Sequence, residues 1–151
     1  MKFLLPILLL LITFGGCAQK NAFERFHLKN SQELAEDNLQ SSKVVNTKAD
    51  VVAIVTAVYL NKTDPKIYKD YEYFYLYLYK KNKKSKVEFY LNEKPAILVE
   101  SLPVQNEFTA LTSFHAKWNK YYLVGFAKQN KETLHLKIQL GQNSTILTFK
   151  R

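Results

Sequence analysis

Apolar residues alternate with polar residues along most of the chain, at the two-residue period of β-strands. Residues 134–140 show this most clearly, because leucine or isoleucine alternates there with histidine, lysine and glutamine. Such alternation places one face of a strand on a core and the other in solvent. Residues 51–60 are almost continuously apolar and rich in β-branched side chains, which predicts a largely buried strand. Further strands are predicted at residues 71–80, 87–91, 96–102, 108–118, 121–128 and 145–150.

About seven or eight strands at this spacing predict an all-β fold. Short polar turns separate the strands, for example at Asn119-Lys120 and at residues 141–144, and no helix-length segment lies between them. Crossover connections of a parallel sheet need such segments, so the strands should pair in antiparallel fashion. An antiparallel sandwich or barrel fits, and we favour an antiparallel β-sandwich of immunoglobulin-like architecture. The usual cysteine pair with a tryptophan between is missing, so this likeness carries no function.

The segment before the strands predicts one short helix. Asn30 and Glu33 have the spacing of a capping box, in which two side chains satisfy backbone N–H groups at the start of a helix. We therefore expect a helix from residue 31 to about residue 40. Residues 40–48 predict a linker, and residues 18–30 predict a flexible tether.

The first seventeen residues have the order of a targeting signal. A basic Met1-Lys2 end precedes an apolar run over residues 3–14, and Gly15-Gly16 precedes Cys17, the only cysteine of the chain. The run is shorter than the roughly 20 residues that a membrane-spanning helix needs. This order resembles a bacterial lipoprotein signal, in which a peptidase cuts between Gly16 and Cys17. The resemblance implies that Cys17 carries several fatty acyl chains, of the palmitate type; the alternative is an ordinary secretory signal.

These segments divide the chain into three parts. We expect a lipoprotein signal peptide at residues 1–16, a lipidated tether with the short helix at residues 17–47, and the β-sandwich domain at residues 48–151. The resemblance also implies a place in the bacterial cell envelope. Ala18 stands where an aspartate retains lipoproteins in the inner membrane of enteric bacteria, so we expect the outer membrane, facing the periplasm or the cell surface.

The chain is strongly basic, with a formal net charge of +9. For an envelope protein this charge favours contact with lipid headgroups or acidic glycans before nucleic acid, because these are the anionic surfaces it meets. We expect no nucleic-acid partner. The alternative explanation is an AT-rich genome, which favours lysine and asparagine codons.

Tyrosines occupy one face of the strand predicted at residues 71–80. We call this set the tyrosine face, and it consists of Tyr71, Tyr73, Tyr75, Tyr77 and Tyr79. If exposed, it would offer a flat amphipathic surface to a sugar or to a partner strand. Alternatively, the rings cover a sheet edge or pack under the helix predicted at residues 31–40.

Five lysines lie in the turn that follows, residues 80–86, which we call the lysine turn. Lys81, Lys83 and Lys84 are its candidate anion-binding residues, because clustered ammonium groups attract phosphates and carboxylates. The alternative is a solvated loop between two apolar strands, where charge protects a sheet from edge-to-edge pairing.

Groups capable of catalysis are not arranged in any pattern that predicts an enzyme. His27 lies in the tether, while His115 and His135 lie on separate predicted strands without metal-ligand spacing. The sequence has no nucleophile elbow around a serine and no glycine-rich phosphate loop. We therefore expect no enzymatic activity, no cofactor and no metal.

Three functions remain open at this point. The leading hypothesis is a membrane-anchored envelope lipoprotein whose non-catalytic β-sandwich docks on another envelope protein or acts as a scaffold. The runner-up is a module that binds an anionic glycan or a lipid headgroup through the tyrosine face and the lysine turn. The third is a hydrolase that uses His115 or His135 together with a carboxylate from one of the strands.

Overall fold

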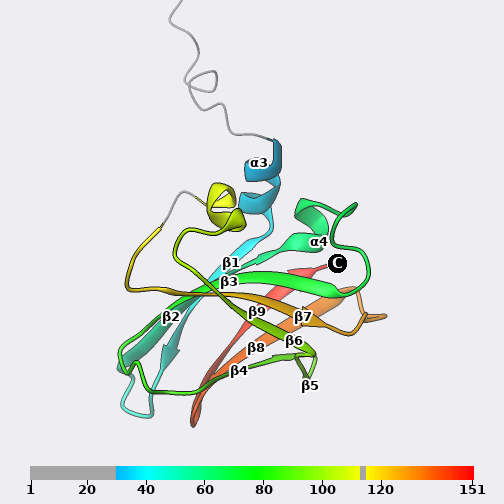
Figure 1. Ribbon diagram of the computed structural model, residues 1–151. Coiled ribbons are helices and arrows are strands. Elements are labelled where there is room, and N and C mark those ends of the chain that lie inside the picture. The colour runs from blue at the N-terminus through cyan, green and yellow to red at the C-terminus, as the bar shows by residue number, and fades with distance from the viewer. Residues whose placement is uncertain (1–29, 113–114) are drawn as a thin grey trace, which may run out of the picture.

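The protein folds into two antiparallel β-sheets that pack face to face (Figure 1). The computed structural model describes residues 30–112 and 115–151, and these contain nine strands. The predicted all-β, antiparallel β-sandwich is therefore confirmed. Its likeness to an immunoglobulin domain is limited to the two layers, because strands that are consecutive in sequence lie side by side in the larger sheet.

The larger sheet has five strands. In spatial order they are β1 (Leu39–Val45), β2 (Val51–Tyr59), β3 (Glu72–Lys80), β7 (Lys120–Phe126) and β6 (Leu98–Leu102). The smaller sheet has four strands, in the order β5 (Lys94–Pro95), β4 (Val87–Leu91), β8 (Thr133–Leu140) and β9 (Asn143–Lys150). The described residues also form three short helices: α3 (Asn30–Asp37), α4 (Leu60–Thr63) and the 3₁₀ helix η1 (Glu107–Leu111).

The main core lies between the two sheets. Alternate residues of each strand point into it, so Phe74, Leu76 and Leu78 from β3 meet Leu136 and Ile138 from β8. The alternation of apolar and polar residues at 134–140 corresponds to the structure as expected, because one face of β8 is buried and the other is solvated. The predicted strands other than the one at residues 108–118 are found, with ends displaced by at most two residues.

The two sheets approach each other along both sides of the sandwich. On one side the chain changes sheets between β5 and β6: the N–H of Ala96 donates to Phe89 of the smaller sheet, and the N–H of Ile97 donates to Gly125 of the larger sheet. On the other side β1 lies beside β9, and the hydroxyl groups of Ser42 and Thr145 form a hydrogen bond of 2.8 Å across the gap. We call this second contact the β1–β9 seam.

The linker predicted at residues 40–48 is wrong, because β1 occupies most of it. β1 pairs with β2 along its whole length, so the sheet begins at Leu39, inside the segment predicted as tether. The sequence of β1 lacks the apolar alternation that predicts a strand, because Val44 is the one residue of β1 that is buried in the main core. The polar side chains have partners instead: the hydroxyl of Ser41 lies 2.7 Å from that of Thr56.

The strand predicted at residues 108–118 is also wrong. Its first part forms η1, and the described residues that follow lead through a turn into β7. The physical reason is that the side chain of Phe108 packs against the outer face of the larger sheet, and its backbone does not pair with a neighbouring strand. The predicted short helix is confirmed as α3, which ends at Asp37.

The signal, the cleavage site at Gly16-Cys17 and the tether up to residue 29 lie outside the described residues. Within the described ranges, no helix has the length and apolar character needed to cross a membrane.

Candidate functional site

The tyrosine face lies on the outer surface of the larger sheet, away from the main core. Register places Tyr75 opposite Val58 of β2 and Leu123 of β7, and Tyr77 opposite Thr56 and Tyr121. Val58, Tyr121 and Leu123 belong to a second apolar cluster outside the sandwich. The prediction that the tyrosines share a face is therefore correct, but their exposure differs along it.

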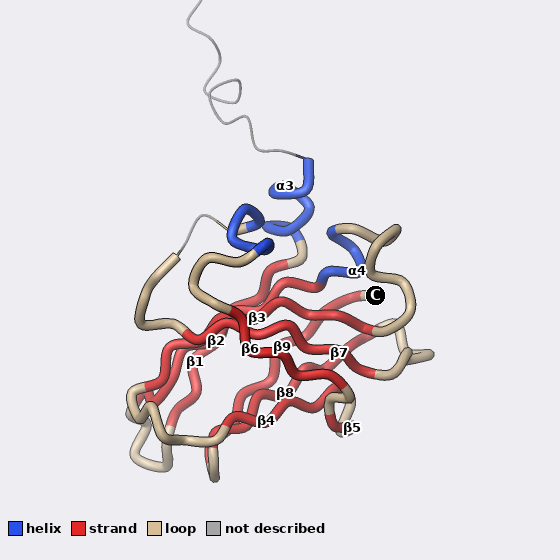
Figure 2. The backbone as a smooth tube through the Cα atoms, in the orientation of Figure 1, coloured by secondary structure: helices blue, strands red, loops and turns tan. Residues whose placement is uncertain are grey.

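The middle of this face is covered. Tyr75 is completely buried, with Phe108 of η1 stacked on its ring at a centroid distance of 5.0 Å. α3 completes the cover beside η1 (Figure 2), where Gln32 Nε2 donates to the carbonyl of Ala110 at 2.7 Å. Ala35 of α3 is buried in the same cluster. The alternative reading, in which the rings pack under a helix, thus holds for the middle of the tyrosine face.

A pocket opens at the end of β3 that lies beyond this cover. Its floor comes from Ile54 and Thr56 of β2 with Tyr77 and Tyr79 of β3, and its wall comes from Trp118 and Asn119 in the turn before β7. The cavity has a volume of about 340 Å³. Trp118 is 64% exposed although it is a large apolar side chain, and Ile54 and Tyr79 are also exposed. We call this cavity the Trp118 pocket.

Lysines lie beside Trp118 in a second hollow. A smaller hollow of about 90 Å³ is lined by this tryptophan and by four lysines, which we call the lysine rim: Lys80, Lys83, Lys117 and Lys120. An apolar aromatic pocket and a cationic rim therefore share one side chain. Exposed aromatic rings beside clustered positive charge are the elements of a site for an anion that also has a flat or apolar part.

The lysine rim is electrostatically crowded. Burial and the nearby charge of Lys120 lower the pKa of Lys80. Lys80 Nζ donates to the carbonyl of Ser85 at 2.5 Å, which holds this ammonium group at the base of the lysine turn. A bound anion would relieve the repulsion between the two lysines, so the rim favours a negative ligand. Deeper in the Trp118 pocket, burial raises the pKa of Tyr77 while a hydrogen bond with Thr56 lowers it.

The structure brings together three of the predicted site residues, namely Tyr77, Tyr79 and Lys83. The others lie elsewhere. Tyr71 and Tyr73 lie at the opposite end of β3, where their rings meet edge to face at 5.7 Å. Lys81 lines a separate cavity with Val52 and Leu140.

Lys84 of the lysine turn lines none of these cavities; its N–H donates to Asn82 Oδ1 within the turn. Sequence reasoning missed Ile54, Trp118 and the lysines on either side of the tryptophan. The available signal was the segment Lys117-Trp118-Asn119-Lys120, where the only tryptophan of the chain ends a predicted strand and directly precedes a predicted turn.

A second unusual feature is the exposed edge of the larger sheet. Among the described strands β6 pairs with β7 alone, and Ile97, Leu98 and Val99 are all exposed at its start. The strand holds no lysine or proline, and Glu100 is its one charged residue, whereas edges are commonly protected by several charges or a proline. We call the segment from Ile97 to Leu102 the β6 edge.

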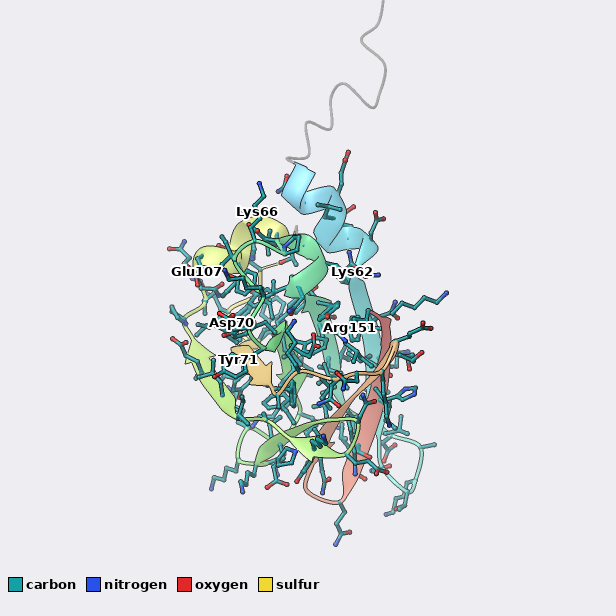
Figure 3. The ribbon with its side chains drawn as sticks, turned by 90° about the vertical axis from the view of Figure 1, so that its right-hand side faces the viewer. Lys62, Lys66, Asp70, Tyr71, Glu107 and Arg151 are labelled. Carbon is teal, nitrogen blue, oxygen red and sulfur yellow. The ribbon has the colours of Figure 1, made fainter. Side chains whose placement is uncertain are left out.

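A buried charged cluster lies at the end of the sandwich near Arg151. Glu72 is fully buried, and its carboxylate accepts from the hydroxyl of Tyr59 at 2.6 Å and from the N–H of Gln129 at 3.2 Å. Arg151 Nε lies 3.6 Å from the same carboxylate, and the guanidinium also donates to the carbonyl of Gln129. Arg151 lies on the side of the molecule shown in Figure 3, as does Tyr71. Every oxygen and nitrogen named here has a protein partner, which indicates a structural cluster.

The histidines proposed for a hydrolase lie on opposite surfaces. His115 lies in the segment over the larger sheet, beside Val104 and Lys117. His135 lies on the outer face of the smaller sheet, where its Nδ1 is 3.2 Å from the hydroxyl of Thr148. Within the described ranges, neither histidine forms an ion pair or a hydrogen bond with a carboxylate. In the part of the chain that the structure describes, no three or more histidine, cysteine or acidic side chains are grouped as a metal site would require.

In comparisons with known proteins, no family model, no curated protein and no solved structure matches this chain.

Proposed function

We propose that this protein is a lipid-anchored envelope lipoprotein whose non-catalytic β-sandwich docks on another protein through the β6 edge. The observation that carries this proposal is the run of exposed apolar side chains on an edge strand, Ile97 to Val99. The lipoprotein-like signal ending at Cys17 supplies the expected anchor, and the outer membrane is the expected location.

The β6 edge is suited to strand addition. An edge strand presents unpaired backbone N–H and C=O groups that can pair with an extended segment of another chain. The other edges of the described sheets are protected, since β1 and β9 lie against each other and β5 has two residues and ends at Pro95. Consecutive exposed apolar residues also supply side-chain contacts on both faces of an added strand, because successive side chains point in opposite directions.

The partner that fits this edge is a different protein rather than a second copy. Two copies would each be strongly basic, since the full chain has a formal net charge of +9 and cleavage before Cys17 removes only the charge of Lys2, and like charges repel during approach. A partner with an acidic surface is attracted instead, and its strand needs apolar side chains opposite Leu98 and Val99. Anchoring both proteins in one membrane would raise their effective concentration, so a single strand pair can suffice.

In-cell photocrosslinking tests the proposal. A photoreactive amino acid at Glu100, which is exposed on β6, should give one discrete protein adduct in intact cells. Val99→Lys should abolish that adduct, because a lysine on an edge strand opposes pairing. The matched control is Ile146→Lys, which adds the same charge at an exposed apolar position of the smaller sheet and should leave the adduct unchanged.

A second control concerns the anchor. Cys17→Ala should release the protein from the membrane and weaken the adduct, since co-localisation is lost. Absence of any protein adduct from Glu100, or an adduct that survives Val99→Lys, would count against docking at the β6 edge.

A further inference from the structure

We infer that the Trp118 pocket and the lysine rim form a binding site for an acidic sugar, that is, a pyranose ring carrying a carboxylate. This site is separate from the β6 edge, because the pocket lies over β2 and β3 whereas β6 is separated from β3 by β7. The inference therefore does not depend on the docking proposal.

The aromatic rings supply the first part of the argument. Trp118 and Tyr79 are 64% and 42% exposed, and both line the same cavity. The face of an aromatic ring carries partial negative charge, so it attracts the polarised C–H groups on the flat side of a pyranose ring. Rings that line a concave, solvent-open surface meet this requirement better than rings spread on a flat one.

Polar residues in the lining of the pocket supply the second part. Tyr79, which is 42% exposed, brings a phenol hydroxyl to the lining, and Asn119 and Thr56 are the other polar residues there. A sugar needs this combination, because its hydroxyl groups lie at the rim of the ring and seek donors and acceptors there. The volume of about 340 Å³ falls at the small end of the range for small-molecule sites, about 300–1,000 Å³, and suits a short sugar segment.

The lysine rim supplies the third part, the negative charge of the ligand. Four lysines line the hollow that also borders Trp118, and no carboxylate lines that hollow. A carboxylate on the sugar could reach the rim while the ring stacks on the tryptophan. A lysine binds an anion as a point charge without fixing its orientation, so one rim could serve successive carboxylates of a polymer.

A phosphate or a phospholipid headgroup explains the structure less well. Such a ligand would use the lysine rim but would leave exposed Ile54, Tyr79 and Trp118 without a role. Exposed lysines are common on protein surfaces, whereas exposed apolar side chains gathered around one cavity are uncommon and mark a binding site. The ligand should therefore contact these apolar side chains.

The single tryptophan allows a direct test. Trp118 is the only tryptophan of the chain, so fluorescence of the full chain in a non-ionic detergent reports on this pocket when it is excited at the long-wavelength edge, where the tyrosines do not absorb. Titration with an oligogalacturonate, a chain of carboxylated pyranose rings, should change the fluorescence in a saturable way. The methyl ester of the same oligosaccharide keeps the rings but loses the charge, and glycerol phosphate keeps a charge but lacks the ring. Both should bind at least about tenfold more weakly.

Matched variants separate the two halves of the site. Lys117→Ser with Lys120→Ser should weaken oligogalacturonate binding at least about tenfold, whereas Lys81→Ser with Lys84→Ser removes the same charge outside the rim and should change it less than about threefold. Likewise, Tyr79→Ala should weaken binding strongly. Tyr71→Ala should not, although Tyr71 is 43% exposed and lies on the same side of the sheet.

Several outcomes would overturn the inference. A fluorescence that none of the three compounds changes excludes an acidic sugar at the Trp118 pocket. Equal affinity for the methyl ester removes the role of the lysine rim, and equal affinity for glycerol phosphate removes the role of the sugar ring and favours a phosphate or lipid headgroup. None of these results concerns the β6 edge, so the proposal that a partner docks there is tested independently.

Discussion

At the scale of single residues, the buried carboxylate of Glu72 joins parts of the chain that are far apart in sequence. It accepts hydrogen bonds from Tyr59 of β2 and from the backbone at Gln129, and it lies near Arg151 after β9. A carboxylate can remain in an apolar core only when such partners replace its lost water. The cluster therefore ties the ends of several strands together, and each partner can be tested separately.

Tyr59→Phe removes one of these partners with little change of shape. Hydrogen bonds to a charged group contribute about 1.5–3 kcal/mol, so the free energy of unfolding in urea should fall by about that amount. Tyr71→Phe removes an exposed hydroxyl and should change the free energy by less than about 0.5 kcal/mol. Equal effects of the two substitutions would show that the Tyr59–Glu72 hydrogen bond adds nothing to stability.

In the β4–β5 turn, by contrast, a substitution that relieves backbone strain should increase the free energy of unfolding. Asn92 and Glu93 have φ values of 48° and 71°, and they connect Leu91 to its partner Lys94. Two positive φ values in a two-residue turn are best met by Asn-Gly, because a side chain at the second position clashes with the backbone. Glu93→Gly should therefore raise the free energy of unfolding by about 0.5–1 kcal/mol.

The control for that turn is Gln142→Gly in the β8–β9 hairpin. There Gly141 has a φ of 59°, whereas Gln142 is not among the residues with positive φ. A glycine at position 142 gains nothing in the folded state and increases the entropy of the unfolded chain, so stability should fall. Urea unfolding of both variants checks the contrast, and a loss of stability in Glu93→Gly contradicts the turn argument.

At the scale of elements, the sequence predicts well those strands that have a clearly apolar face. β8 alternates strictly and β2 is rich in β-branched residues, so both were predictable from periodicity alone. β1 was not, because its serines are satisfied by hydroxyl partners on β2 and β9 and only Val44 reaches the main core. Its pairing is a tertiary property that no local pattern encodes.

The candidate sites show the same limit. Tyr77, Tyr79 and Lys83 could be predicted from the tyrosine alternation and the lysine turn. Trp118 could not be joined to them, since the pairing of β3 with β7 decides which turn lies beside the end of β3. The exposed β6 edge likewise depends on sheet order, which the sequence leaves open.

The cover formed by η1 gives an element-scale prediction. Phe108 is almost fully buried against Tyr75, and it holds η1 on the larger sheet. Phe108→Ala should lower the free energy of unfolding by about 3–5 kcal/mol, because it removes a large buried ring and leaves a cavity. The far-ultraviolet circular dichroism of the sheets should persist at low temperature, since the main core is untouched. An effect below about 1 kcal/mol would show that η1 contributes little to the fold.

At the scale of the whole molecule, buried tyrosines make stability depend on alkaline pH. Burial raises the pKa of Tyr68 and of Tyr75 to about 12, against an ordinary value of 10.0, and burial also raises the pKa of Tyr122. Between these values the unfolded chain loses phenol protons that the folded chain keeps, so the unfolded state binds fewer protons and stability falls as pH rises.

We therefore expect the free energy of unfolding to lose this tyrosine contribution progressively between pH 10 and pH 12. Part of the phenolate absorbance should appear only when the β-sheet signal in circular dichroism is lost. Complete phenolate formation at pH 11 with an intact β-sheet signal would contradict the burial of these rings.

The β1–β9 seam forms late during synthesis of the chain. The hydroxyl groups of Ser42 and Thr145 that meet there are separated by 103 positions in the chain. At a synthesis rate of about 5–20 residues per second, β1 emerges roughly 5–20 s before β9 exists to meet it. During that interval one side of β1 has no neighbour, and contacts of such long range also slow folding in general. The nascent chain should therefore depend on a chaperone over this interval, while the finished sandwich does not.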